Sequence, residues 1–91
     1  MTIAIHHPRA DHVADLMAHM RRVVEHTGSP EGMIDFVCAQ EAGGSRLLGV
    51  ARWESPEAFQ AALPRITALA DQRDDAWSER PDELITLTAF D

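Results

Sequence analysis

The chain has no lysine, asparagine or tyrosine, and it has one cysteine among its 91 residues. These absences remove the amine, the asparagine amide and the phenol from any proposed active site. Cys38 cannot form a disulfide within the chain, which is typical of a protein from a reducing compartment. We therefore expect a cytoplasmic protein that is stabilised by its hydrophobic core and by association.

Long hydrophobic runs and a basic charge balance are also absent. No stretch approaches the roughly 18 consecutive apolar residues of a membrane span. The net charge is −7, and such a chain repels phosphate backbones and anionic lipid surfaces. The first residues show no basic segment followed by an apolar core, so no secretion signal is predicted. Neither nucleic acid nor a membrane is an expected partner.

The rest of the composition is that of an ordinary globular protein, with 45% hydrophobic and 25% charged residues. A chain of this length suffices for one domain, which we assign to residues 1–91. Domains of this size bury only about 60 to 65% of their unfolded surface, so a partner would add stability.

The spacing of apolar residues predicts the order β-α-β-β-α-β, the split arrangement of ferredoxin-like domains. A first strand ends at residues 6–8, and a helix follows over 9–26, stopped by Gly28 and Pro30. Strands over 33–40 and 46–53 form a hairpin. Ser55 and Pro56 open a second helix that kinks or restarts at Pro64 and continues to about residue 80. A last strand covers 84–90. The fold class is therefore α+β with an antiparallel sheet.

Both faces of the predicted sheet are apolar. Leu47 and Trp53 point to one face, whereas Leu48 and Val50 point to the other. Two helices cover only one face, and soluble monomers rarely leave a large apolar patch exposed. We therefore expect a homodimer in which the uncovered sheet face meets a second copy of the chain.

One segment resembles a known family. The run from Gly49 to Phe59, in which a strand ends at Trp53 and a capped helix starts with Ala58-Phe59, is similar to the antibiotic biosynthesis monooxygenase family. The element order, a first helix begun at Pro8 and the segment 29–32 agree, so the resemblance covers nearly the whole chain. It implies the fold called a dimeric α/β barrel, formed by two copies of the chain, and activity without a cofactor. Some members oxidise quinols or polyketide anthrones with oxygen, others cleave haem, and many have no known activity.

The chain also departs from that family. The family often has a glutamate at the position of Ala51 and a histidine or tryptophan at the position of Ala62. The haem-cleaving branch uses a strand-one asparagine, a tryptophan at Ala62 and a histidine near Gln72. Because the chain has no asparagine, we do not expect haem degradation.

Histidines are the candidate bases. His12, His19 and His26 recur every seven residues along one edge of the first helix, but successive members lie about 10.5 Å apart, too far to share a metal ion. We expect no metal site. His7 shares the strand face of Ile3 and Ile5, and either His7 or His19 could take a proton from a phenolic substrate. The alternatives are a strand-end residue in water and a partly exposed helix-edge residue.

The candidate ligand-binding residues are apolar or aromatic, with one arginine. They are Trp53, Trp77, Met17, Met20 and Arg52. The tryptophans could flank a flat ligand and the methionines could supply adaptable walls, although core packing explains the same residues. Arg52, at the end of an apolar strand face, needs a carboxylate or a ligand anion, and a salt bridge across the dimer is the simpler explanation. Cys38 shares a strand face with Ile34 and Phe36 and is expected to be buried and inert.

These observations leave two hypotheses. The first is a cofactor-independent monooxygenase acting on a small aromatic quinol, anthrone or polyketide-like substrate. The second is a domain of the same fold without catalysis, which either binds a small ligand or serves as a structural dimer.

Overall fold

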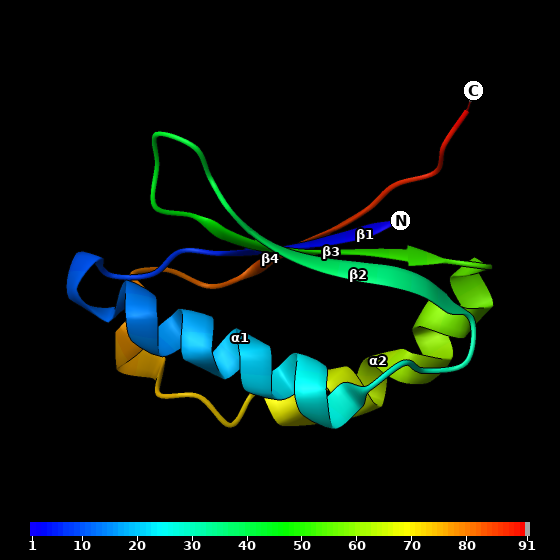
Figure 1. Ribbon diagram of the computed structural model, residues 1–91, viewed down its shortest axis with the longest axis horizontal. Coiled ribbons are helices and arrows are strands. Elements are labelled where there is room, and N and C mark those ends of the chain that lie inside the picture. Colours follow the sequence, from blue (N-terminus) through cyan, green and yellow to red (C-terminus); the bar gives the residue numbers. More distant parts are fainter. Residues whose placement is uncertain (91) are drawn as a thin grey trace.

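The computed structural model describes residues 1–90, in which a four-stranded antiparallel sheet lies on two helices (Figure 1). The sheet order is β2-β3-β1-β4. The strands are β1 (Thr2–His6), β2 (Met33–Gln40), β3 (Leu47–Trp53) and β4 (Glu83–Thr86). The helices are α1 (Val13–Thr27) and α2 (Pro56–Ala70), with short 3-10 turns η1 (Ala10–His12) and η2 (Asp75–Trp77). The predicted order and the α+β class are confirmed.

The two main helices begin and end where local chemistry requires. The Ser55 hydroxyl accepts a hydrogen bond from the Ala58 N–H at 3.2 Å, and Pro56 is the first residue of α2, so the predicted cap is confirmed. Gly28 adopts a positive φ of 66° after α1, and its N–H donates to the Val24 carbonyl.

The second helix is shorter than predicted. It contains Pro64 and bends along its course, but it ends at Ala70 rather than near residue 80 (Figure 1). Acidic residues follow at once, and negative charge is unfavourable at the carboxyl end of a helix. The Asp74 carboxylate accepts from the Ala76 N–H at 2.9 Å and opens η2 instead. Trp77 therefore lies in a separate turn.

The last strand is also shorter than predicted. It ends at Thr86 rather than at residue 90, because within residues 1–90 it pairs in the sheet with β1 alone, and β1 starts at Thr2. The Leu87 N–H still donates to the Met1 carbonyl at 2.7 Å, and beyond it the chain leaves the sheet (Figure 1). The Phe90 side chain is 92% exposed.

The two faces of the sheet have different surroundings. Along β3, Leu47 and Ala51 face the helices and are buried. The core there consists of Leu16, Met20 and Leu47, with Val13, Met17 and Trp77 packed against it. No helix covers the opposite face, where Val50 pairs with Ile3 and Val37 (Figure 1). We call the surface formed by Ile3, Val37, Leu48, Val50 and Ile85 the open face.

Cys38 corrects one expectation. It faces the helix side of the sheet, opposite Gly49, but near the β2 edge the single chain leaves it exposed rather than buried. Partial burial nevertheless raises the pKa of its thiol, since Arg21 only partly offsets that effect. No helix within residues 1–90 is long and apolar enough to cross a membrane.

Candidate functional site

A cavity of about 270 Å³ lies between the two helices and the sheet. Its walls are largely apolar and come from α1, α2 and all four strands of the sheet. They include Ala4, Met20, Val23, Val24, Met33, Phe36, Leu63, Ile66 and Leu84. Gly49 also lines the cavity. The Phe36 ring lies about 3.0 Å from where a Cβ atom of residue 49 would stand, so a larger side chain at this position would crowd the ring. We call this space the central cavity.

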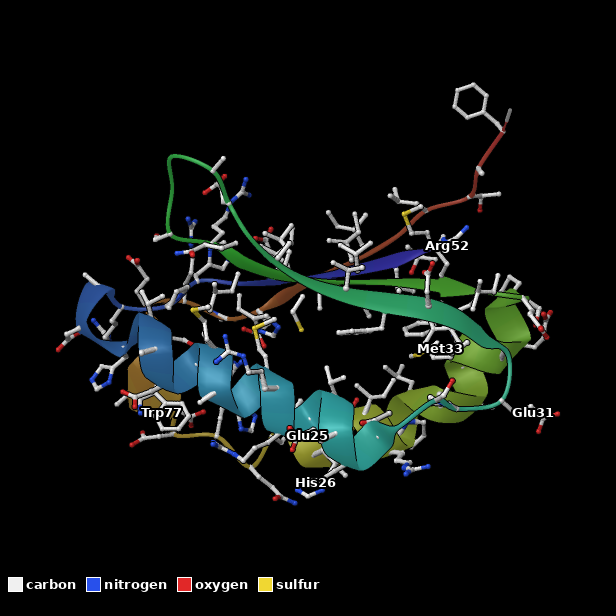
Figure 2. The ribbon with its side chains drawn as sticks, in the orientation of Figure 1. Glu25, His26, Glu31, Met33, Arg52 and Trp77 are labelled. Atoms are coloured by element: carbon white, nitrogen blue, oxygen red, sulfur yellow. The ribbon has the colours of Figure 1, made fainter. Side chains whose placement is uncertain are left out.

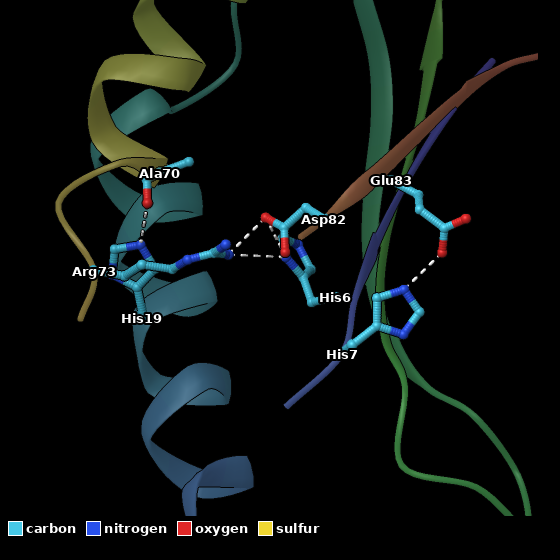
Figure 3. A network of polar contacts seen from close by, with 7 residues as sticks. All are labelled: His6, His7, His19, Ala70, Arg73, Asp82 and Glu83. Atoms are coloured by element: carbon cyan, nitrogen blue, oxygen red, sulfur yellow. Dashed lines mark hydrogen bonds and ion pairs between the residues drawn. The ribbon is translucent and has the colours of Figure 1, made fainter. Parts of the chain in front are cut away.

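The polar side chains at one end of the central cavity form a chain of contacts (Figure 3). Arg73 Nη1 donates to Asp82 Oδ2 at 2.6 Å, and the same oxygen lies 3.0 Å from His6 Nδ1. A carboxylate accepts hydrogen bonds, so His6 carries its proton on Nδ1 and Nε2 keeps a free lone pair. The side chains of His6 and Arg73 are 13% and 15% exposed. The result is a carboxylate-supported imidazole beside an apolar space.

The Asp82 carboxylate is held in its charged form. Burial raises its pKa, but the hydrogen bonds that it accepts from His6 and Arg73, together with the positive charge of Arg73, outweigh that effect, so the net pKa lies below the ordinary value. A charged Asp82 orients the His6 imidazole through their hydrogen bond.

His19, on α1, also lines the central cavity and is buried. Its Nε2 donates to the Ala70 carbonyl at 3.0 Å, which fixes the tautomer with Nδ1 as acceptor (Figure 3). The ring meets Trp77 edge to face, with 6.2 Å between ring centroids. The central cavity therefore brings together one predicted histidine and a second that was not selected.

That second histidine is His6, whereas the predicted His7 lies elsewhere. His7 is not among the residues that line the central cavity. It lies on the other side of β1, where its Nε2 contacts Glu83 Oε2 at 2.6 Å (Figure 3). The face of β1 that carries Ala4 turns toward the helices, and the face that carries Ile3 and Ile5 turns away. The alternation itself indicated that only one of the two histidines could enter the cavity.

Arg73 and Asp82 were missed as well. They are separated from His6 by 67 and 76 residues along the chain, and in the sequence they belong to an acidic stretch that looks like a solvated helix end. Their spacing relative to His6 carries no signal. The pairing of β1 with β4 brings Asp82 to His6, and the segment that follows α2 brings Arg73 to Asp82.

Arg52 finds its carboxylate within the chain. Its Nε lies 3.0 Å from both Asp35 oxygens, because Arg52 and Asp35 are paired on β3 and β2. The expected salt bridge across a dimer is therefore not required. The Arg52 guanidinium lowers the pKa of Asp35, chiefly through the hydrogen bond.

The two tryptophans do not flank one site. Trp53 lines a different cavity, of about 330 Å³, where its Nε1 donates to Thr2 Oγ1 and its ring packs on Phe59. Arg52 lines that cavity too, and it lies at the opposite end of the molecule from Trp77 (Figure 2).

The two methionines predicted to bind a ligand, Met17 and Met20, do not line the same cavities either. Met20 lines the central cavity, and both methionines line a smaller space of about 190 Å³ beside Cys38. Met17 also packs against the core with Trp77. Within residues 1–90, no group of three or more His, Cys, Asp or Glu side chains could hold a metal ion.

No family model and no curated protein matches this sequence. Solved structures do match it. Rv0793 from Mycobacterium tuberculosis has a TM-score of 0.84 at 23% identity, over 99% of this chain and 93% of that chain. A structure described as an antibiotic biosynthesis monooxygenase has a TM-score of 0.81 at 13% identity, over 99% and 97%. A variant of MhuD, solved with two manganese protoporphyrin IX molecules per active site, has a TM-score of 0.76 at 25% identity, over 99% and 94%.

These similarities bear out the resemblance noted in the sequence at the level of the fold. The chain has the ferredoxin-like fold of the antibiotic biosynthesis monooxygenases over nearly its whole length.

Proposed function

We propose, from the fold shared with antibiotic biosynthesis monooxygenases, that this protein is a cofactor-independent oxygenase for a small aromatic substrate. The observation that carries the proposal is the His6–Asp82 pair beside the central cavity. A carboxylate-supported imidazole with a free Nε2 is a competent general base near neutral pH. The apolar walls would exclude water from the reacting carbanion.

The size of the central cavity limits the substrate class. Its volume of about 270 Å³ lies just below the roughly 300 to 1,000 Å³ of pockets that hold drug-sized ligands. A flat molecule of two or three fused rings, such as an anthrone or a naphthoquinol, suits that space. Phe36 would stack on it and Met20 would adapt to its edge.

The chemistry is balanced by substrate and oxygen alone. His6 Nε2 takes one proton from an anthrone methylene group, and the resulting carbanion transfers electrons to oxygen, forming a carbon–oxygen bond. The imidazolium returns the proton to give a hydroperoxide. Loss of the second methylene proton then cleaves the oxygen–oxygen bond and releases the ketone and water. One methylene group and one oxygen molecule become one carbonyl group and one water molecule. His19, with Nδ1 as acceptor, would bind a substrate hydroxyl.

Oxygen uptake tests this proposal. Metal-stripped protein should consume oxygen with a panel of anthrones and hydroquinones, and boiled protein should not. His6→Ala should lower the rate about 10²- to 10⁴-fold, the usual contribution of a general base. His7→Ala is the matched control, because His7 lies on the other side of the same strand, and it should retain most of the rate.

Two results would count against an oxygenase. One is no uptake across the panel, and the other is equal loss in the two histidine variants. If the panel instead quenched Trp77 fluorescence saturably without product, the cavity would be a binding site without catalysis. Trp77 is a suitable reporter because it contacts His19 at the edge of the cavity.

We also propose that two copies associate through the open face. The supporting observation is the exposure of large apolar side chains there, 56% for Val37 and 41% for Ile85. Light scattering should give about twice the chain mass of 10.1 kDa at micromolar concentration. A mass of one chain would exclude this assembly.

A further inference from the structure

We propose that Arg73 binds the substrate oxygen that becomes negatively charged when His6 removes the proton. The preferred substrates are then neutral aromatic molecules whose conjugate base carries its charge on a ring-conjugated oxygen. This inference rests on the proposed function of the central cavity, and it adds a group that stabilises the reacting substrate to the base.

The position of Arg73 supports this role. Its side chain reaches from the loop after α2 across to Asp82, next to the start of β4, and to His6 on β1 (Figure 3). It is 15% exposed, and it is the only arginine among the described residues that line the central cavity. Its Nη1 lies 3.4 Å from His6 Nδ1, so the guanidinium stands next to the proposed base.

Arg73 also has donors to spare. A guanidinium has five N–H groups, and within residues 1–90 the Asp82 carboxylate is the only acceptor bonded to any of them. The contact with His6 Nδ1 joins two donors, because that nitrogen already donates to Asp82. The remaining N–H groups are free to bind an oxyanion, the partner that a planar guanidinium recognises best.

The charges match the substrate only after proton transfer. Before transfer, the positive Arg73 and the negative Asp82 cancel each other, and the acidic residues Asp71 and Glu83 also line the cavity, so the site does not attract an anionic ligand on entry. When His6 accepts the proton, the three side chains carry one net positive charge, which faces the one negative charge created on the substrate. Interactions that strengthen only as charge develops lower the barrier rather than tightening ground-state binding. Aromatic carboxylates, already anionic, would lack this match on entry.

A chromogenic phenol tests the proposal without turnover. The probe is 4-nitro-1-naphthol, whose anion is coloured, and its methyl ether serves as the control that cannot ionise. Bound to the wild-type protein, the probe should ionise about one pH unit below the free probe, a tenfold preference for the charged state of the complex. Arg73→Gln should abolish this shift, and Arg73→Lys should keep part of it. Arg22→Gln removes the same charge from an exposed position on α1 and should leave the shift intact.

Asp82→Asn separates oxyanion binding from a purely positioning role. If Arg73 acts only by holding Asp82, both Arg73→Gln and Asp82→Asn should weaken ionisation of the bound probe. If Arg73 binds the oxyanion, Asp82→Asn should keep or enlarge the shift, because it leaves the positive charge uncompensated, while oxygen uptake falls. Thermal unfolding checks that each variant is folded.

The inference is overturned if wild-type protein fails to bind the probe, if Arg73→Gln retains the shift, or if the two variants move it in the same direction. Oxygen uptake by the wild-type protein is measured separately. A shift that depends on Arg73 without any uptake would reject the oxygenase and leave the anion site standing. Oxygen uptake without a shift that depends on Arg73 would support the oxygenase and reject the anion site.

Discussion

The Asp82 carboxylate should link stability to pH. Its pKa is depressed in the folded protein, whereas the unfolded value is about 3.9. A depressed pKa stabilises the fold above the unfolded value, and this contribution is lost as pH falls through the folded value. Asp82→Asn should therefore be less stable than wild type at pH 7, and the difference should shrink below about pH 4. Urea unfolding at a series of pH values measures it.

The control for this measurement is a variant that removes another carboxylate whose pKa is lowered in the folded protein. Asp35→Asn serves, since Asp35 is paired with Arg52 in solvent, where salt screens the interaction. Its effect on stability should be small at every pH. A difference between Asp82→Asn and wild type that stays constant from pH 7 to pH 2 would contradict the linkage.

The sequence predicted a histidine as the candidate base, but it did not show which histidine lines the central cavity. Alternation along β1 separated His6 from His7, yet both faces of the strand carry apolar residues, so hydrophobicity could not show which face meets the helices. Ile3 and Ile5 are larger than Ala4 and drew the prediction to His7. In the structure, the smaller Ala4 lines the central cavity, where a small side chain leaves room for a ligand.

At the scale of elements, the cap of α2 makes a separate prediction. The Ser55 hydroxyl accepts the Ala58 N–H, one of the amides that the first turn of a helix leaves unpaired. Ser55→Ala should lower the free energy of unfolding by about 0.5 to 2 kcal/mol. Ser29→Ala, in an exposed loop, is the matched control and should change it little. Chemical denaturation decides, and equal effects in the two variants would contradict the capping role.

The elements themselves were predictable because their signals are local. Periodicity, Gly28, and the Ser55–Pro56 start fixed the order and most boundaries. The errors lie at ends that are set by other parts of the fold. β4 ends where β1 no longer offers a pairing partner. α2 ends before a group of acidic residues, although the helical spacing of apolar residues continues past them. The Arg73–Asp82–His6 contacts likewise depend on distant parts of the chain, because β1–β4 pairing brings Asp82 to His6 and the segment after α2 brings Arg73 to both.

At the scale of the whole molecule, the open face should govern assembly. Val37 is 56% exposed there, and a glutamate at that position would place charge in the proposed interface. Val37→Glu should shift the light-scattering mass from about twice to about one times the chain mass. Ala61→Glu adds the same charge to an exposed position on α2 and should leave the mass unchanged. A dimer that persists in Val37→Glu would argue for another interface.

The fold by itself does not specify a function. Structures at 13 to 25% identity superpose on nearly the whole chain, which shows how little of the sequence this architecture requires. Function has to be argued from the side chains that the fold holds in place. Here these are one histidine, one aspartate and one arginine at the end of an apolar cavity.

The consecutive histidines at the end of β1, His6 and His7, have a consequence for how the edge strand β4 is aligned. Since Leu84 and Ile85 are both apolar, a slip of β4 by one residue would exchange their faces at little hydrophobic cost, and burial alone specifies the register weakly. Asp82 and Glu83, however, each meet a histidine, one on either side of the sheet. A slip would separate both pairs at once. The two pairs therefore favour the observed register of β4 over a register shifted by one residue. The His6–Asp82 pair of the proposed site is thus supported by the His7–Glu83 pair on the other side of the sheet.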